Sequence, residues 1–206
     1  MSRQPRKDFL LETAYRLFNE HGYHATGIDL ILAESGVSKA TLYKYFRTKD
    51  DLILEVLKRR HDEFDAIVDS CIQKCLDNKG SAPAHQAILA IFDALNDWIN
   101  SKQFFGCNFI NASAEYGALN DPIHRFAAEH KESLRGKVKA FLSGLKKSQR
   151  EVLADQLLML IDGAIVSAQV RGDRQSALKA KKAGAVLLGL PDQASSFPNI
   201  SPSLTG

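Results

Sequence analysis

The sequence predicts an all-α protein of about nine helices, with a small amino-terminal three-helix domain and a larger carboxy-terminal helical domain. Apolar residues recur at intervals of three and four along nearly the whole chain, which is the period of one helix face. No stretch shows the apolar and polar alternation that a half-buried strand requires. We expect the domains to span residues 1–52 and 53–190, followed by a loosely ordered tail over 191–206 that is rich in Ser and Pro.

The first helix is expected from about Lys7 to His21, where Gly22 ends it. Its apolar stripe consists of Leu10, Ala14, Leu17 and Phe18. Arg3, Arg6 and Lys7 form a basic arm before this helix. Such an arm would lie along a phosphate backbone or enter a minor groove, and a solvated tail is the alternative.

Two short helices around a tight turn are expected over residues 28–46. The stripe of the first consists of Ile28, Ile31 and Leu32, and the pattern breaks at Ser35-Gly36-Val37. Gly36 can take a turn conformation that is closed to most residues. Ser38 then supplies a cap for the next helix. Together these features predict a helix-turn-helix.

The second of these helices has an outer face suited to the major groove of DNA. Leu42 and Phe46 face inward, and the opposite side carries Lys39, Ala40, Tyr43 and Lys44. Lysines neutralise phosphates, a small alanine lets the backbone approach base edges, and a tyrosine offers a hydroxyl and a flat ring. The alternative is a helix-turn-helix that serves only as a packing unit.

A long helix is expected to follow, from Thr48 to about Leu76. Thr48 and Asp51 have capping-box spacing, and Asp77-Asn78-Lys79-Gly80 ends the helix. No flexible linker separates the two domains. A helix that starts beside DNA and continues into the second domain would act as a lever, so that displacement of its far end moves the recognition helix.

Several short motifs occur in a fixed order near the amino terminus: Leu17-Phe18, His21-Gly22-Tyr23, Thr26, Gly36-Val37-Ser38, Thr41-Leu42-Tyr43, Tyr45-Phe46 and Lys49-Asp50-Asp51-Leu52. In order and spacing, over about fifty residues, they resemble the amino-terminal domain of TetR-family transcriptional regulators. The resemblance implies an all-helical homodimer that binds double-stranded DNA at a palindromic operator, most often as a repressor. It also implies a carboxy-terminal domain that binds a small-molecule effector and forms the dimer.

Carried over position by position, the resemblance implies DNA contacts by Thr26, Ser38, Lys39, Ala40, Thr41, Tyr43, Lys44, Tyr45 and Lys49. Two positions depart from the family pattern. Gly27 stands where the family often has serine or threonine, so that Thr26 is expected to cap the second helix instead. Leu32 stands where a small alanine is frequent, which affects local packing.

Five further helices are expected: Pro83–Ser101, Cys107–Tyr116, Asp121–Leu145, Gln149–Val170 and Arg174–Leu188. The middle ones gather aromatic and polar residues, as a small-molecule pocket requires. The effector-pocket candidates are Phe92, Trp98, Phe105, Phe109, Asn111, Tyr116, Phe126, His130 and Asp162. Asn108, Asn111 and Glu115 lie between aromatic residues, so burial of any of them requires a hydrogen-bonding partner or a ligand. Ordinary core packing is the alternative for the aromatic residues.

The last two helices are expected to form the dimer through a four-helix bundle. The candidates are Leu157, Ile161, Ala164, Ile165, Ala168, Ala180, Ala183, Gly184 and Leu187. Packing of these stripes within one subunit is the alternative, because it uses the same residue types. A dimer would hold two recognition helices about 34–36 Å apart and allow them to read a palindrome.

The cysteines raise the alternative of a thiol sensor. Cys107 is expected at a helix amino terminus, where the helix dipole favours the reactive thiolate, and a small buried hydrophobe is the competing interpretation. Cys71 and Cys75 lie one helical turn apart and are interpreted as packing residues. We expect no bound metal and no cofactor.

Composition excludes several classes of function. The net charge of +3 implies no polyelectrolyte partner for the whole chain, so DNA binding must come from a local patch. The amino terminus has no apolar segment of a signal peptide, and no later stretch is long enough to span a membrane, which indicates a cytoplasmic protein. Catalytic motifs are absent, so an enzyme is not expected. A helical adaptor that does not bind DNA is the alternative from another class.

Overall fold

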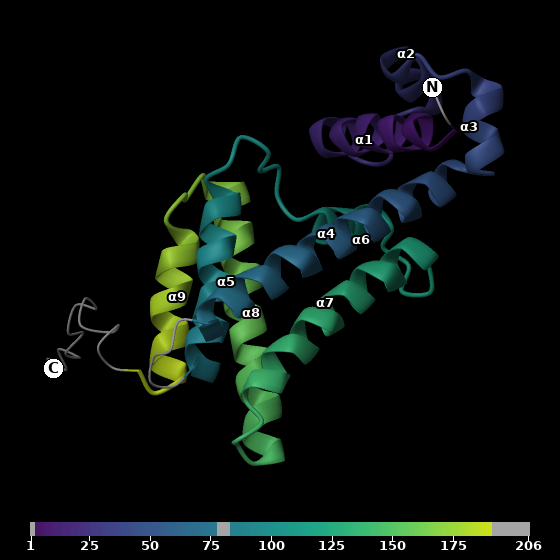
Figure 1. Ribbon diagram of the computed structural model, residues 1–206. Helices are drawn as coiled ribbons and strands as arrows, with labels where there is room; N and C mark the ends of the chain where they lie inside the picture. Colours follow the sequence, from purple (N-terminus) through teal and green to yellow (C-terminus); the bar gives the residue numbers. More distant parts are fainter. Residues whose placement is uncertain (1–2, 78–82, 191–206) are drawn as a thin grey trace, which may run out of the picture.

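The computed structural model describes residues 3–77 and 83–190 of the chain, and within them it contains nine α-helices and no strand (Figure 1). The helices are α1 (Arg3–His21), α2 (Ile28–Ser35), α3 (Lys39–Tyr45), α4 (Lys49–Asp77), α5 (Pro83–Ile99), α6 (Asn108–Glu115), α7 (Pro122–Phe141), α8 (Lys147–Arg171) and α9 (Ser176–Leu187). The all-α prediction is confirmed. The expected tail over 191–206 lies outside the described residues.

Helices α1 to α3 form a small lobe at one end of the long helix α4, which runs on into the larger body (Figure 1). α1 packs against both α2 and α4. The core of the lobe includes the predicted stripe of α1 and the inward residues of the next two helices, all buried: Leu10, Ala14, Leu17, Phe18, Ile31, Leu42 and Phe46. The positions of apolar residues therefore predicted the inner faces of this lobe correctly.

The basic segment at the amino terminus is not a separate arm, because Arg3, Arg6 and Lys7 belong to the first turns of α1. The Lys7 ammonium donates to Glu55 Oε1 at 2.6 Å and lies 5.7 Å from the centre of the Phe46 ring. An ion pair with α4 and the Phe46 ring at the end of α3 thus hold Lys7, and α1 begins at Arg3, four residues before its predicted start.

The turn of the helix-turn-helix and the caps of α3 and α4 follow the predicted chemistry. Gly36 ends α2 with a φ of 62° and donates to Leu32 O at 2.9 Å, a backbone conformation that favours glycine. The Ser38 hydroxyl accepts a hydrogen bond from the Thr41 N–H and so caps α3. Thr48 and Asp51 form the expected reciprocal capping box at the start of α4, with both N–H bonds at 3.0 Å.

The body consists of α4 to α9. α5 packs against α4 and α9, α8 packs against α9 and α7, and the short α6 lies on α7. α7 ends at Phe141, earlier than expected, because the chain turns there and the Leu145 N–H bonds to Leu142 O at 3.0 Å.

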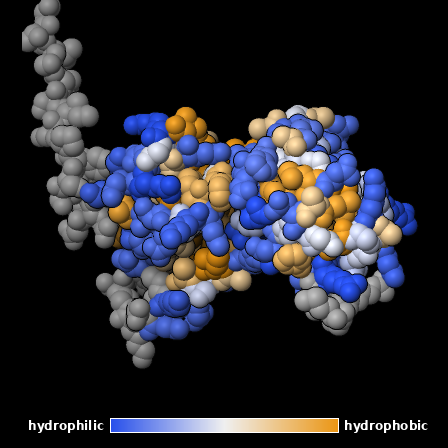
Figure 2. Space-filling model, turned by 90° about the horizontal axis from the view of Figure 1, so that it is seen from above, coloured by the Kyte–Doolittle hydropathy of each residue, from blue (hydrophilic) through white to orange (hydrophobic). Residues whose placement is uncertain are grey.

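Apolar residues on the face seen from above form separate patches among hydrophilic ones (Figure 2). None of the helices in the described part of the chain has the length and apolar character needed to cross a bilayer.

Candidate nucleic-acid interface and effector site

Helix α3 presents the predicted recognition face to solvent. Its outward residues Lys39, Ala40, Tyr43 and Lys44 are exposed, whereas Leu42 is fully buried beneath them. This follows from the period of a seven-residue helix that rests on one apolar side chain. The face combines two ammonium groups, a phenol and the small methyl side chain of Ala40. Ammonium and phenol groups contact phosphates and base edges, and a small side chain lets the backbone approach them.

The other residues expected at DNA lie around this face. Ser38 is exposed, and its hydroxyl lies 2.9 Å from that of the half-buried Thr41. Tyr45 is half-buried, with its ring 6.2 Å from that of Phe46. Lys49 begins α4, and its ammonium donates to the His24 carbonyl oxygen at 3.2 Å.

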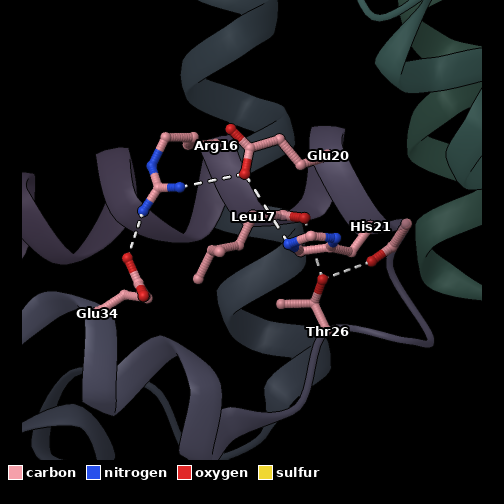
Figure 3. A network of polar contacts seen from close by, with 7 residues as sticks. Arg16, Leu17, Glu20, His21, Thr26 and Glu34 are labelled. Atoms are coloured by element: carbon pink, nitrogen blue, oxygen red, sulfur yellow. Dashed lines mark hydrogen bonds and ion pairs between the residues drawn. The ribbon is translucent and has the colours of Figure 1, made fainter.

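Thr26 has a different role from the one expected. Its side chain is fully buried, and its hydroxyl donates to the carbonyl oxygens of Gly22 at 2.7 Å and Leu17 at 3.1 Å (Figure 3). The prediction that Thr26 caps α2 is wrong, because Gly27 occupies the cap position and no side-chain cap bond forms there. The hydroxyl instead ties the segment before α2 to the carboxy-terminal part of α1 and has no exposed surface.

An ion pair of Arg16 links α1 to α2 (Figure 3). The Arg16 guanidinium donates to Glu20 on its own helix at 3.1 Å and to Glu34 on α2 at 2.9 Å. His21 Nε2 lies 3.9 Å from the same Glu20 carboxylate. Exposed contacts of this kind each contribute little to stability, and of these three only the Arg16–Glu34 pair connects α1 to α2.

A cavity of about 80 Å³ lies in the body between α4, α5, α6, α7 and α8. It is lined by Arg60, Phe64, Ile67, Val68, Ile91, Ala94, Leu95, Trp98, Cys107, Asn108, Phe109, His130, Lys131, Leu134, Ile161 and Ile165. Small-molecule sites commonly have volumes of about 300–1,000 Å³, so a drug-sized occupant would have to expand this one.

Only three of the expected pocket residues, Trp98, Phe109 and His130, line this cavity. The others do not: Phe92 is buried beside Gly184 of α9, and Phe105 is exposed. The remaining four are engaged elsewhere: Asn111 accepts from Gln169, Phe126 packs on His61, Asp162 accepts from Lys131 at 2.6 Å, and Tyr116 faces the amino-terminal lobe.

The α4 wall of the cavity was missed by the sequence prediction. Arg60, Phe64, Ile67 and Val68 follow the helical interval of three and four, so the signal was present in the sequence. The sequence alone, however, did not distinguish a stripe that lines a cavity opposite Trp98 from one that packs in the hydrophobic core. Ile161 and Ile165, expected at the dimer interface, line the same cavity.

Two histidines meet at the cavity. Nδ1 of His61 and Nδ1 of His130 lie 2.9 Å apart, and the His130 ring stacks on Phe109 with the ring centres 3.5 Å apart. Burial, then the Lys131 ammonium and His61, lower the pKa of His130 to about 3. His130 is therefore neutral at physiological pH and can offer one donor and one acceptor nitrogen.

Arg60 is a cationic residue of the cavity with a buried hydrogen-bond donor that lacks a partner. Its Nη1 donates to Glu63 and its guanidinium carbon lies 4.8 Å from the centre of the Tyr15 ring. Its Nε is buried and has no hydrogen-bond partner. A buried donor without a partner is costly, so an acceptor brought by an occupant would be favoured there.

Cys107 lies in the cavity wall at the cap position of α6, as expected, and is 5% exposed. Cys71 is partly exposed. The described residues contain no group of three His, Cys, Asp or Glu side chains placed to hold a metal ion.

The predicted association residues mostly face the interior of their own chain. Leu157, Ile161, Ala164, Ile165, Ala168, Ala180 and Gly184 are buried, and Ala183 is partly buried. The small residues of α9 allow α5 and α8 to pack close to its backbone. A methyl group added at Gly184 would lie 3.3 Å from both Phe92 and Leu157. These side chains are unavailable to a second copy, so this part of the prediction is corrected. Leu187 remains exposed.

A different apolar stripe of α8 and α9 faces solvent. On α8 it consists of Val152, Met159, Gly163, Val166 and Val170, and on α9 the apolar residues Val186 and Leu187 are exposed. Residues 152, 159 and 166 recur every seven residues, the interval of helices that pack side by side. α8 is apolar on both sides, and the sequence prediction assigned the inner side to the partner.

The lobe of three helices, with its exposed basic and tyrosyl third helix, defines a helix-turn-helix protein of the transcriptional regulator class. Residues 10–56 match the family model described as bacterial regulatory proteins, tetR family. This match and the similar proteins below support a TetR-family transcriptional regulator.

Full-length comparisons agree with this assignment. The crystal structure of SCO4454, a TetR-family transcriptional regulator from Streptomyces coelicolor, covers 89% of this chain and 94% of its own, with a TM-score of 0.79 and 29% identity. The HTH-type transcriptional regulator YxaF of Bacillus subtilis is 26% identical over 84% of this chain and 90% of its own. The transcriptional activator FasR of Mycolicibacterium smegmatis is 38% identical over 45% of this chain and 42% of its own.

Proposed function

We propose that the protein is a dimeric repressor that binds a palindromic operator through α3 and is released by a small molecule bound in the body. The observation that carries the proposal is the outer face of α3. The Ser38 cap and the buried Leu42 hold this helix, and its outer face leaves Tyr43 and Lys44 exposed. Helicity, exposure, charge and a flat ring coincide on one short element, which suits insertion into a major groove.

We propose that the protein represses transcription rather than activates it. FasR, similar over less than half of either chain, is named an activator, so the sign has to be measured for this chain. A reporter gene placed behind the operator would decide it. Deletion of the protein should raise transcription if it represses, and should lower transcription if it activates.

The proposed effector is a small, mostly apolar molecule that carries at least one hydrogen-bond acceptor. The walls of the cavity are mainly aliphatic and aromatic, and they contain Arg60 and Lys131 but no carboxylate. The unpartnered Nε of Arg60 supports an acceptor in the ligand. An apolar cation would add a positive charge beside Arg60 and Lys131 without a carboxylate in the wall to pair with it, and should bind poorly.

A thiol mechanism is the second candidate, because Cys107 lies in the cavity wall and begins α6. Under this alternative, an electrophile enters the cavity and modifies the thiol. A Cys107→Ser variant that still releases DNA in response to the reversible effector, but no longer responds to an electrophile such as N-ethylmaleimide, would separate the two mechanisms.

The decisive experiment is DNA binding by fluorescence anisotropy, on the DNA upstream of the protein's own gene and on scrambled DNA, at two salt concentrations. Lys44→Ala should weaken binding to both DNAs and reduce the slope of log affinity against log salt by about one. Lys58→Ala is the matched control, because Lys58 is an exposed lysine on α4, away from α3. Tyr43→Ala should lower the preference for the operator over scrambled DNA.

Equal effects of Lys44→Ala and Lys58→Ala would contradict the assignment of α3 as the recognition helix. A helical adaptor would show no salt-sensitive DNA binding in any variant. If the wild-type protein shows no preference for the upstream DNA, selection from random DNA tests for an operator elsewhere, and failure of that selection would reject the proposal.

A further inference from the structure

We infer that Glu115 is a positioning residue for DNA binding, because its carboxylate holds the helix-turn-helix lobe at a fixed angle to the body. A molecule bound in the cavity would displace α6 and so change this contact. The inference rests on the proposed function for its regulatory consequence. The contact itself can be tested without DNA.

Glu115 is the last residue of α6, and both of its carboxylate oxygens bond to the turn between α1 and α2. Oε1 accepts the Tyr23 N–H at 2.8 Å, and Oε2 accepts the His24 N–H at 2.6 Å. Oε2 also lies 3.1 Å from Nδ1 of His24. Hydrogen bonds from N–H groups to an ionised carboxylate are stronger than those between neutral groups, so one side chain joins two parts of the molecule firmly.

The turn is shaped to receive this carboxylate. Gly22 has a φ of 87°, and a Cβ added there would lie 3.0 Å from Oε1 of Glu115. The glycine therefore both ends α1 and permits the close approach. Beyond it, the consecutive N–H groups of Tyr23 and His24 lie in the turn, outside α1 and α2, and point to the two oxygens.

Neighbouring contacts extend the junction to α4 and α7. The Tyr116 ring stacks on His24 with the ring centres 4.7 Å apart, and its hydroxyl donates to Asp50 at 3.3 Å. Nδ1 of His124 lies 2.8 Å from the Tyr116 carbonyl oxygen, which fixes this end of α6 to α7. The junction thus reaches the first turn of the helix that follows α3.

The other end of α6 lies at the cavity. Asn108 lines the cavity, and its side-chain amide donates to Asn19 of α1 at 2.5 Å. Its main-chain carbonyl oxygen accepts a hydrogen bond from the Tyr23 hydroxyl at 3.1 Å. Phe109 follows it in the cavity wall. A short helix therefore contacts the cavity at its first residues and the lobe at both of its ends. A drug-sized occupant has to enlarge a cavity of about 80 Å³, and displacement of the α6 wall would move both contacts.

The functional consequence concerns the distance between two recognition helices. A palindrome is read only when both helices reach successive major grooves, so a change in the angle of each lobe changes the preferred spacing of the half-sites. With Glu115 bonded, the angle is fixed and the protein prefers one spacing. With the contact broken, the lobe samples several angles, and both specific affinity and the spacing preference fall.

The test compares Glu115→Ala and Glu115→Gln with Glu129→Ala. Glu129 is an exposed carboxylate on α7, so its removal changes the net charge equally without touching the lobe. Three quantities are measured: hydrogen exchange of the Tyr23 and His24 amides, affinity for the selected operator, and affinity for operators with one base pair added to or removed from the centre. Circular dichroism checks that each variant remains helical.

We expect amide exchange at Tyr23 and His24 to accelerate at least about tenfold in Glu115→Ala. Operator affinity should fall by a similar factor, within the roughly 5–150-fold range of coupling between sites. The penalty for the wrong spacing should shrink, and Glu115→Gln, which keeps one acceptor oxygen, should lie between. Wild-type exchange and wild-type spacing preference in Glu115→Ala would overturn the inference.

The cavity end is tested by filling it, since no effector is needed for that. Ala94→Leu places a larger side chain in the cavity wall and should accelerate exchange at Tyr23 and His24 and weaken operator binding. Added to Glu115→Ala, it should have no further effect on binding, because both act through the same contact. Additive effects would show that cavity and lobe are not coupled through Glu115. If the wild-type protein bound no operator, the proposed function would fail, and amide exchange would still decide whether the contact exists and responds to the cavity.

Discussion

The imidazole of His130 is 4% exposed, between the Phe109 ring and the side chain of His61. Burial removes water that would solvate an imidazolium, and the positive charge of Lys131 opposes a second one nearby. The folded-state pKa of about 3 therefore lies well below the ordinary histidine value of 6.5. As the pH falls below 6.5, the unfolded chain takes up a proton at this residue before the folded protein does.

Acid should therefore destabilise the protein through His130. The stability due to the neutral imidazole is complete above pH 6.5 and is lost as the pH falls towards 3. One such group contributes a slope of up to about 1.4 kcal/mol per pH unit. We expect wild type to lose about 1 to 2 kcal/mol more than His130→Gln between pH 7 and pH 5.

Urea unfolding at several pH values measures this difference, and His21→Gln, at an exposed histidine of α1, is the matched control. Parallel stability curves for wild type and His130→Gln over that interval would contradict the assignment of a buried neutral imidazole.

Glu115 shows what the sequence indicates about a single residue. Its position among aromatic residues marked it as a polar group that needs a partner once buried. The partners, however, are N–H groups 92 and 91 residues earlier in the chain, and only the packing of α6 beside the lobe identifies them.

At the scale of the element, α9 owes its position to small side chains. Gly184 allows Phe92 of α5 and Leu157 of α8 to approach its backbone so closely that a Cβ added at the glycine would lie 3.3 Å from each of them. Gly184→Val should therefore force these neighbours apart and cost about 1–3 kcal/mol of stability.

Gly136→Val on α7 is the control, because a Cβ there meets nothing within 4 Å and valine has a somewhat better helix propensity than glycine. Chemical denaturation of the two variants should give opposite signs. A Gly184→Val protein as stable as wild type would show that α9 is free to move away from α5 and α8.

Helix α8 shows why an apolar stripe in a helical sequence is ambiguous. α8 has apolar residues on two sides, so its periodicity marked the buried stripe of Leu157 and Ile161 without excluding a second stripe. The first residues of α1 were ambiguous for a related reason. Arg6 and Lys7 resemble a solvated arm in sequence, but in the structure α1 already begins at Arg3, and Lys7 pairs with Glu55 of α4.

At the scale of the whole molecule, the exposed stripe of α8 and α9 is our proposed dimer interface. Met159 and Val170 are 71% and 76% exposed, which is unusual for apolar side chains that lie in register along one helix face. A glutamate at either position would be solvated in the monomer but would lack a partner in a closed apolar interface.

Met159→Glu and Val170→Glu should shift the protein from dimer to monomer in sedimentation equilibrium without loss of helicity. Operator affinity should fall at least about tenfold, since two recognition helices would no longer be held together. Leu119→Glu is the matched control, because Leu119 is 79% exposed in the loop before α7. Retention of the dimer by both α8 variants would place the interface elsewhere.

The sequence by itself determined the helical content, the register of the helix-turn-helix, the caps that begin α3 and α4, and the outer face of α3. Each of these depends on interactions within a few residues: the period of a helix, the hydroxyl of Ser38, the φ of Gly36 and the pairing of Thr48 with Asp51. Tertiary structure decided which side of α8 faces inward, which aromatic residues line the cavity, and where the Glu115 carboxylate binds. An apolar stripe shows that a helix face must be buried, and a polar group among apolar residues shows that it needs a hydrogen-bond partner. The residues that bury the face or supply the partner come from distant parts of the chain, so only the packed fold identifies them.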